Sequence, residues 1–218
     1  MKFTAKTKYM IELHNIDCME YLATLEDNAF ELAIVDPPYG IDVTKMTLGN
    51  GKKKIHRGQT NWDAQTPSKE YFYHLFRVSR NQVIWGANYM TPHLPASMGW
   101  VYWDKGTGEN DFSDGELAFT SFHRALRSFK KSWVGANANN GTARIHPTEK
   151  PIQLYEWLLM NYAKEGDRIL DTHLGSGSIA IACHNLGFDL VGCELDADYF
   201  NAAEKRLKQH QSQMRIPL

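Results

Sequence analysis

The chain has 218 residues, 43% of them apolar, and a formal net charge of −1. That length and apolar content suit one buried core, so we expect a single domain over residues 1–218. A near-neutral charge argues against a protein that coats nucleic acid, although a local basic patch can still contact it. No apolar run approaches the roughly 20 residues of a membrane span, and residues 1–6 lack the apolar core of a signal peptide. We therefore expect a cytoplasmic protein with no membrane partner.

The three cysteines, Cys18, Cys183 and Cys193, show no Cys-x-x-Cys spacing and lie beside apolar segments. An odd number cannot pair completely, and metal sites need clustered ligands. We expect reduced, partly buried thiols and no structural metal.

The N-terminal part of the chain predicts a strand over residues 9–14, a turn, and a helix over residues 19–25 before the next strand. Two strands joined through a helix imply a parallel pair with a right-handed crossover. Asp17 would then lie at the edge of the sheet where ligands of open α/β sheets bind. It is equally well placed to cap the helix, and the sequence leaves both roles open.

The second strand, residues 32–35, ends in a rigid turn with the sequence Asp36-Pro37-Pro38-Tyr39. Each proline fixes its own φ and keeps the preceding residue extended, so the carbonyls of this turn point outward. A carboxylate, free carbonyls and an aromatic ring together suit a flat heterocycle with an exocyclic amine, such as adenine or cytosine. The plainer alternative is a strand terminator with an Asp by chance.

The chemistry of such a turn follows from the weak nucleophilicity of an exocyclic amine. Acceptors on both of its hydrogens, Asp36 and the Pro37 carbonyl, would free the lone pair of the nitrogen. The carboxylate would also stabilise the positive charge that develops there. Tyr39 would stack on the base, which is worth roughly 1–3 kcal/mol.

This turn resembles the catalytic motif of the amino-group DNA methyltransferases, which transfer a methyl group from S-adenosylmethionine to adenine N6 or cytosine N4. The resemblance implies a Rossmann-like, mostly parallel α/β fold, S-adenosylmethionine as cofactor, DNA as partner, and a bacterial or phage-infected cell. Asp in the first position usually accompanies adenine in this family, so the resemblance favours adenine N6. Residues 85–89 and 103–105 also look like segments of its small phage and bacterial members.

Two stretches carry clustered basic residues that we consider as DNA contacts. Residues 41–66 lose all periodicity and read as a long loop, and residues 106–145 contain polar turns. The second stretch lies where the family usually carries its target-recognition region, and its small size favours a short or relaxed recognition site. Each cluster could equally be a solvated surface. The candidates are Lys52, Lys53, Lys54 and Arg57 in the first stretch, and Arg124 and Arg127 in the second.

Between these stretches we expect a helix over residues 68–78 and strands at 82–85, 100–103 and 116–122, the last pair antiparallel. Residues 146–151 then lead into a helix over residues 152–164. A helix N-terminus with a nearby lysine suits a carboxylate. The segment resembles the family's motif for the methionine end of the cofactor, which implies contacts from His146, Thr148 and Lys150.

In the C-terminal part we expect a strand over residues 168–171, a glycine turn, a helix over 179–186, a strand over 189–194 and a final helix over 198–209. The glycine turn and the carboxylate at the end of the second strand predict a nucleoside site. Glu194 lies 19 positions beyond Gly175, the spacing at which a carboxylate reaches ribose hydroxyls. The family's equivalent motifs imply cofactor contacts from Asp17 and Cys18 near the adenine, and from Asp171, Gly175, Ser176, Gly177, Ser178 and Glu194.

Other interpretations remain at this point. The Gly175-x-Gly177-x-x-Ala180 pattern also fits a dinucleotide-binding fingerprint, although an NAD enzyme has no use for the Asp36 turn. Because the catalytic turn precedes the glycine turn, the resemblance assigns a circularly permuted motif order of the β type. Thr172, His173 and Ser178 depart from the family's glycine motif, which leaves a catalytically silent binding module open. Cytosine N4 or RNA adenine as the target, and a monomer or a homodimer, also stay open.

Overall fold

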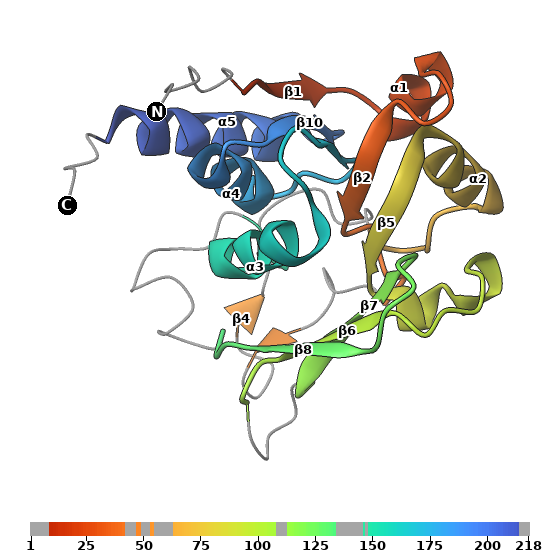
Figure 1. Ribbon diagram of the computed structural model, residues 1–218. Helices are drawn as coiled ribbons and strands as arrows, with labels where there is room; N and C mark the ends of the chain where they lie inside the picture. The colour runs from red at the N-terminus through yellow and green to blue at the C-terminus, as the bar shows by residue number, and fades with distance from the viewer. Residues whose placement is uncertain are drawn as a thin grey trace, which may run out of the picture.

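The computed structural model describes residues 9–41, 47–48, 53–54, 63–107, 113–133, 146 and 148–213 (Figure 1). An eight-stranded sheet has the order β1-β10-β9-β2-β5-β7-β6-β8, and β3 and β4 form a separate pair. The strands are β1 (Ile11–Asn15), β2 (Phe30–Val35), β3 (Thr47–Leu48), β4 (Lys53–Lys54), β5 (Ser79–Trp85), β6 (Trp100–Asp104), β7 (Gly115–Thr120), β8 (Arg127–Lys130), β9 (Arg168–Asp171) and β10 (Asp189–Glu194). The helices are α1 (Cys18–Thr24), α2 (Lys69–Val78), α3 (Ile152–Tyr162), α4 (Ser178–Leu186) and α5 (Ala197–Ser212), with short 3₁₀ turns η2 (Ala87–Tyr89) and η3 (Thr91–His93).

The sheet is mostly parallel, as predicted. Strands β1, β10, β9, β2 and β5 run in one direction, whereas β7 is antiparallel to both β5 and β6. The antiparallel strand therefore lies inside the sheet, and β6 and the edge strand β8 continue beyond it.

Strands β1 and β2 are parallel but are not neighbours, which corrects the expected pair. Strands β10 and β9 lie between them. The interior positions of β9 and β10 are buried, while those of β1 are only half-buried. The more apolar unit thus takes the centre of the sheet, and β1 takes its edge.

The strands that carry the two predicted turns lie side by side. Strand β2 pairs with β9 in the register Leu32 with Ile169 and Ala33 with Leu170. Because parallel strands end at the same edge of a sheet, the Asp36 turn and the glycine turn emerge together. The permuted motif order therefore brings both turns to one edge.

Helices cover both faces of the sheet (Figure 1). Helices α1 and α2 pack on one face, where Leu22 and Leu75 are fully buried. Helices α3, α4 and α5 pack on the other face, with Leu158 and Ile181 in that core. Among the described helices, none has the length and apolar character needed to cross a membrane.

Two elements differ from the sequence-based expectation. Residues 47–48 and 53–54 pair antiparallel as β3 and β4, so the prediction of an unbroken loop over 41–66 is wrong there; most of that loop lies outside the described residues. Strand β8 was not predicted because Phe129 is its only apolar residue, and as an edge strand β8 is largely exposed. The polar stretches 106–110 and 136–141 lie mostly outside the described residues.

Candidate active site

The Asp36 turn is held in place by hydrogen bonds from both sides. Asp63, which is 2% exposed, accepts the backbone N–H groups of Tyr39 (2.7 Å) and Gly40 (3.1 Å) through one carboxylate oxygen. The Tyr39 hydroxyl donates to Asp36 Oδ1 at 2.6 Å. Pro37 is buried. The turn is therefore pre-organised by the protein, in addition to the constraint from its prolines.

The ring of Tyr39 lies directly over the backbone of Gly86, at the end of β5. A Cβ atom at Gly86 would lie 2.1 Å from Tyr39 Cε1, and the φ of Gly86 is +64°. Tyr89, whose side chain is 47% exposed, stacks on Tyr39 with ring centroids 5.4 Å apart and an interplanar angle of 18°. Gly86 and Tyr89 thus pack against the ring of Tyr39, a contact that the sequence alone did not indicate.

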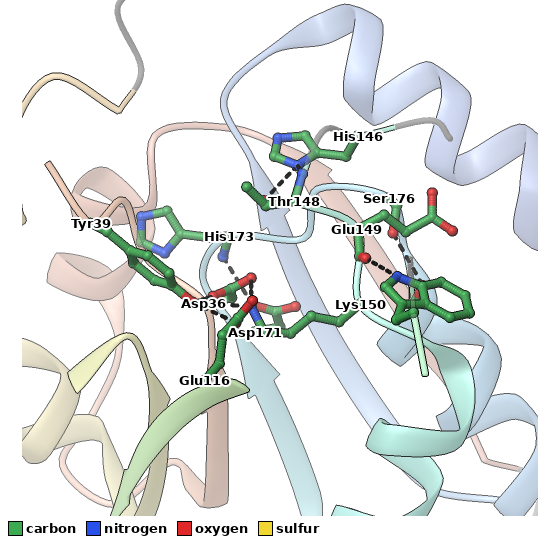
Figure 2. Close-up of polar contacts among 12 residues, drawn as sticks. Asp36, Tyr39, Glu116, His146, Thr148, Glu149, Lys150, Asp171, His173 and Ser176 are labelled. Carbon is green, nitrogen blue, oxygen red and sulfur yellow. Dashed lines mark hydrogen bonds and ion pairs between the residues drawn. The ribbon is translucent and has the colours of Figure 1, made fainter. Parts of the chain in front are cut away.

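Lys150 joins this turn to a second carboxylate, Glu116 of β7 (Figure 2). The Lys150 ammonium lies 2.5 Å from Asp36 Oδ2, 2.9 Å from Glu116 Oε2 and 3.0 Å from the Tyr39 hydroxyl. The other oxygen of Glu116 pairs with Lys105 at 2.5 Å. The Lys150 side chain is 1% exposed. Two carboxylates and two ammonium groups therefore balance their charges in one largely dry cluster.

The pKa values of this cluster follow from burial and pairing. Burial raises the pKa of Asp36, and the attraction of Lys150 only partly opposes this. Burial would also raise the pKa of Glu116, but Lys150 and Lys105 outweigh it and lower the value to about 2. Burial would lower the pKa of Lys150, yet the two carboxylates hold it above its ordinary value. Glu116 and Lys150 are therefore charged at neutral pH.

The glycine turn and Glu194 meet as the spacing predicts. Gly175 and Gly177 both have positive φ values, +52° and +73°. Glu194 Oε2 accepts the N–H of Gly175 at 2.8 Å, and its other oxygen accepts the N–H of Asp196 at 3.0 Å. The carboxylate that we expect to bind ribose hydroxyls therefore lies directly against the glycine turn.

Asp171 and His173 lie between the glycine turn and the catalytic cluster. Asp171 is 1% exposed, and its Oδ1 atom accepts the backbone N–H of His173 at 3.0 Å. Burial raises the pKa of Asp171 to about 8 and lowers that of His173 to about 4. Thr172 contacts both the Tyr71 hydroxyl (2.7 Å) and His173 Nδ1 (2.9 Å). Burial thus favours the neutral form of the His173 imidazole, which is held by its neighbours.

The His146 side chain lies against the glycine turn. The His146 ring would lie 3.7 Å from a Cβ atom at Gly175, and it contacts Tyr199 edge-on. The Thr148 hydroxyl lies 3.0 Å from His146 Nδ1. The expected proximity of this segment to the glycine turn is therefore present, although Lys150 itself contacts the Asp36 turn.

Arg206 of α5 links this segment to the glycine turn. Its guanidinium donates to the Ser176 carbonyl (2.9 Å) and the Ser178 hydroxyl (3.1 Å), and pairs with Glu149 at 3.1 Å. Arg206 was not predicted as a site residue, because a basic residue within an amphipathic helix is usually exposed to solvent.

We expect Arg206→Met to weaken S-adenosylmethionine binding about ten-fold, because the variant loses charge-assisted hydrogen bonds that position the glycine turn. Isothermal titration of the cofactor measures this. Lys205→Met, which alters an exposed neighbour on the same helix, is the control. Equal affinity in both variants would contradict the positioning role of Arg206.

The remaining candidates are distributed as follows. Asp17 caps α1 by accepting the Met19 N–H at 2.8 Å, and half-buried Cys18 begins that helix. Arg124 donates to the Asn161 carbonyl and packs over the ring of Tyr162, so it supports α3. Arg127 is exposed on β8. Lys53 and Lys54 form β4, and Lys52 and Arg57 lie outside the described residues.

Lys105 and Glu116, which complete the charged cluster around Asp36 and Lys150, were not predicted from the sequence. Lys105 directly follows an apolar strand and Glu116 begins the next one. Since the predicted pair is antiparallel, these positions had to approach each other. The signal was therefore a pair of opposite charges at matching ends of a predicted hairpin.

A parallel sheet with a glycine turn beside an acidic, proline-rigid turn defines a methyltransferase of the Rossmann-like class. A family model described as DNA methylase (N6_N4_Mtase) matches residues 95–205. The chain belongs to this family of amino-group DNA methyltransferases, whose methyl donor is S-adenosylmethionine.

Individual relatives agree with this assignment. The type II methyltransferase M1.MboII of Moraxella bovis is 21% identical, over 91% of this chain and 96% of the relative. The structure of TTHA0409 from Thermus thermophilus, complexed with S-adenosyl-L-methionine, has a TM-score of 0.60 at 19% identity, covering 94% of this chain and 98% of that one. The cytosine-N4-specific PvuII methyltransferase has a TM-score of 0.56 at 12% identity, covering 96% and 95%. The fold is thus shared with a cytosine-N4-specific enzyme, and it does not by itself identify the target base.

Proposed function

We propose that this protein methylates adenine N6 in DNA, with S-adenosylmethionine as donor and the target base rotated out of the duplex. The observation that carries the proposal is the pairing of β2 with β9, which sets Asp36 beside the glycine turn. The Asp in the first position of the catalytic turn supports adenine as the base. The type II relatives support a DNA-modification role.

The residues of this chain fit the cofactor. Gly175 and Gly177 leave a backbone without side chains, and the Glu194 carboxylate lies against that turn, which supports a contact with the ribose hydroxyls. His146 and Thr148 cover the other side and suit the methionine end. When bound, S-adenosylmethionine supplies the electrophilic methyl group.

The Asp36 turn positions and activates the amine of the base. Asp36 accepts one N–H of this amine and the Pro37 carbonyl accepts the other, which localises the lone pair on nitrogen. The carboxylate then stabilises the positive charge on that nitrogen in the transition state. Tyr39 stacks on the ring, and the exposed Tyr89 beside it extends the aromatic surface.

No covalent bond between enzyme and base is needed for this reaction. An exocyclic amine attacks directly, so holding it in line with the methyl group supplies most of the catalysis. Burial raises the pKa of both Cys18 and Cys193 to about 12, which keeps these thiols protonated at neutral pH. Neither thiol is therefore assigned a role as a nucleophile.

The proposal is tested by incubating the protein with methyl-labelled S-adenosylmethionine and unmethylated duplex DNA, then digesting the DNA to nucleosides. We expect the label in N6-methyladenosine of the DNA. Label in N4-methylcytosine would replace the adenine assignment by the cytosine alternative, and a parallel incubation with RNA tests the RNA alternative. Cofactor binding without transfer to any nucleic acid would instead indicate a silent binding module.

A further inference from the structure

Glu116 reaches the catalytic turn from the far side of β5. It lies on β7, which follows β5 in the sheet, whereas Asp36 follows β2 on the other side of β5. Its Oε2 atom lies 2.9 Å from the Lys150 ammonium and 3.2 Å from the Tyr39 hydroxyl. The carboxylate thus contacts two groups that also contact Asp36.

Each carboxylate oxygen of Asp36 already accepts one hydrogen bond from the protein. Its Oδ1 accepts from Tyr39, and its Oδ2 accepts from Lys150. Lys150 in turn has three hydrogens and three acceptors: Asp36, Glu116 and the Tyr39 hydroxyl. An amine that donates to Asp36 Oδ2 would therefore share this oxygen with a positively charged donor.

We infer that Glu116 is a positioning residue for methyl transfer: it holds Lys150 as a second anion, so that Asp36 can accept the amine of the target base. This inference rests on the proposed function. Without Glu116, Asp36 would be the one carboxylate partner of the buried ammonium among the described residues, and the ammonium would hold Asp36 more strongly. Lys105 completes the arrangement, because it balances the charge of Glu116 at 2.5 Å.

The charged groups around Asp36 act on its pKa in opposite directions. Lys150, Glu116 and Tyr39 face Asp36 directly, and Asp171 interacts with it from the end of β9. The negative charge of Glu116 raises the pKa of Asp36, whereas the positive charge of Lys150 lowers it. Removal of these two charges should therefore move the titration of Asp36 in opposite directions.

The test compares Glu116→Gln and Lys150→Met with the unmodified protein, measuring kcat across pH and the dissociation constant of S-adenosylmethionine. For Glu116→Gln we expect kcat to fall about 10- to 100-fold, with cofactor affinity unchanged and the acidic limb of the kcat profile displaced to lower pH. For Lys150→Met we expect that limb at higher pH. Glu204→Gln, which breaks an exposed ion pair with Lys208, is the control.

Two results would overturn the inference. One is wild-type kcat in Glu116→Gln; the other is a reduced kcat whose acidic limb stays in place, because a purely structural role lowers activity without moving a titration. Absence of methyl transfer by the unmodified protein would instead refute the proposed function, and the inference with it. The two failures are therefore distinguished by the activity of the unmodified protein.

Discussion

Asp36→Ala is expected to abolish methyl transfer while leaving S-adenosylmethionine binding unchanged. The variant loses the charged acceptor for the amine and the group that stabilises the developing positive charge. Loss of such a pre-organised electrostatic group costs about 10²–10³-fold in kcat. Asp36 contacts Tyr39 and Lys150, whereas the cofactor contacts that we propose lie on the glycine turn, Glu194, His146 and Thr148. Single-turnover methylation and cofactor titration measure the two properties separately.

Two further variants sharpen this experiment. Asp36→Asn keeps the size of the side chain but removes its charge, so a similar loss would assign the effect to charge. Asp27→Ala, which removes a 72% exposed carboxylate paired with Arg77, is the surface control, since exposed ion pairs contribute about 0–1 kcal/mol. Activity retained in Asp36→Ala would refute the role that we assign to Asp36.

Gly86→Ala is expected to lower both activity and stability, because the Tyr39 ring occupies the space that a Cβ atom needs. The ring must move away from Asp36 and Glu116, and the backbone of Gly86 also has a positive φ. We expect about a 10- to 100-fold loss of kcat, and a loss of about 1–3 kcal/mol in the free energy of unfolding. Steady-state kinetics and urea denaturation measure these changes.

Gly166→Ala separates the effect of backbone strain from the effect of the clash with the Tyr39 ring. Gly166 also has a positive φ, +88°, but a Cβ atom there would meet nothing within 4 Å. This control therefore reports backbone strain without a clash. If both variants lost the same stability and kept wild-type activity, the position of the Tyr39 ring would be irrelevant to catalysis.

Local patterns predicted most elements of this fold. Strand β9 was predicted at its observed bounds because an apolar run ends there at Asp171, and α4 ends before Gly187 because glycine adopts the left-handed conformation at that position. Strand neighbours were less predictable. Whether β1 lies beside β2 or beside β10 depends on which strands bury more apolar surface, and that is a property of the whole sheet.

In the candidate site, too, local motifs were predictable and contacts between distant segments were not. The turns around Asp36 and Gly175 could be recognised because each depends on a few adjacent residues. The contacts of Glu116 with Lys150 and Tyr39 required knowledge that β7 pairs with β5. Lys150 was expected beside the cofactor because its motif suggests a carboxylate site, yet it contacts the carboxylate of Asp36. Short-range motifs do not specify which of several anions a long side chain will reach.

The adjacency of β2 and β9 has a consequence for biosynthesis. These strands belong to the beginning and the final third of the chain, so a ribosome must release most of the polypeptide before they can pair. Contacts between such distant segments also slow folding, since a long loop must close first. The sheet edge that carries the Asp36 turn and the glycine turn therefore forms only late in synthesis. If the chain were expressed as two pieces divided within residues 134–145, the pieces would have to associate to restore this edge.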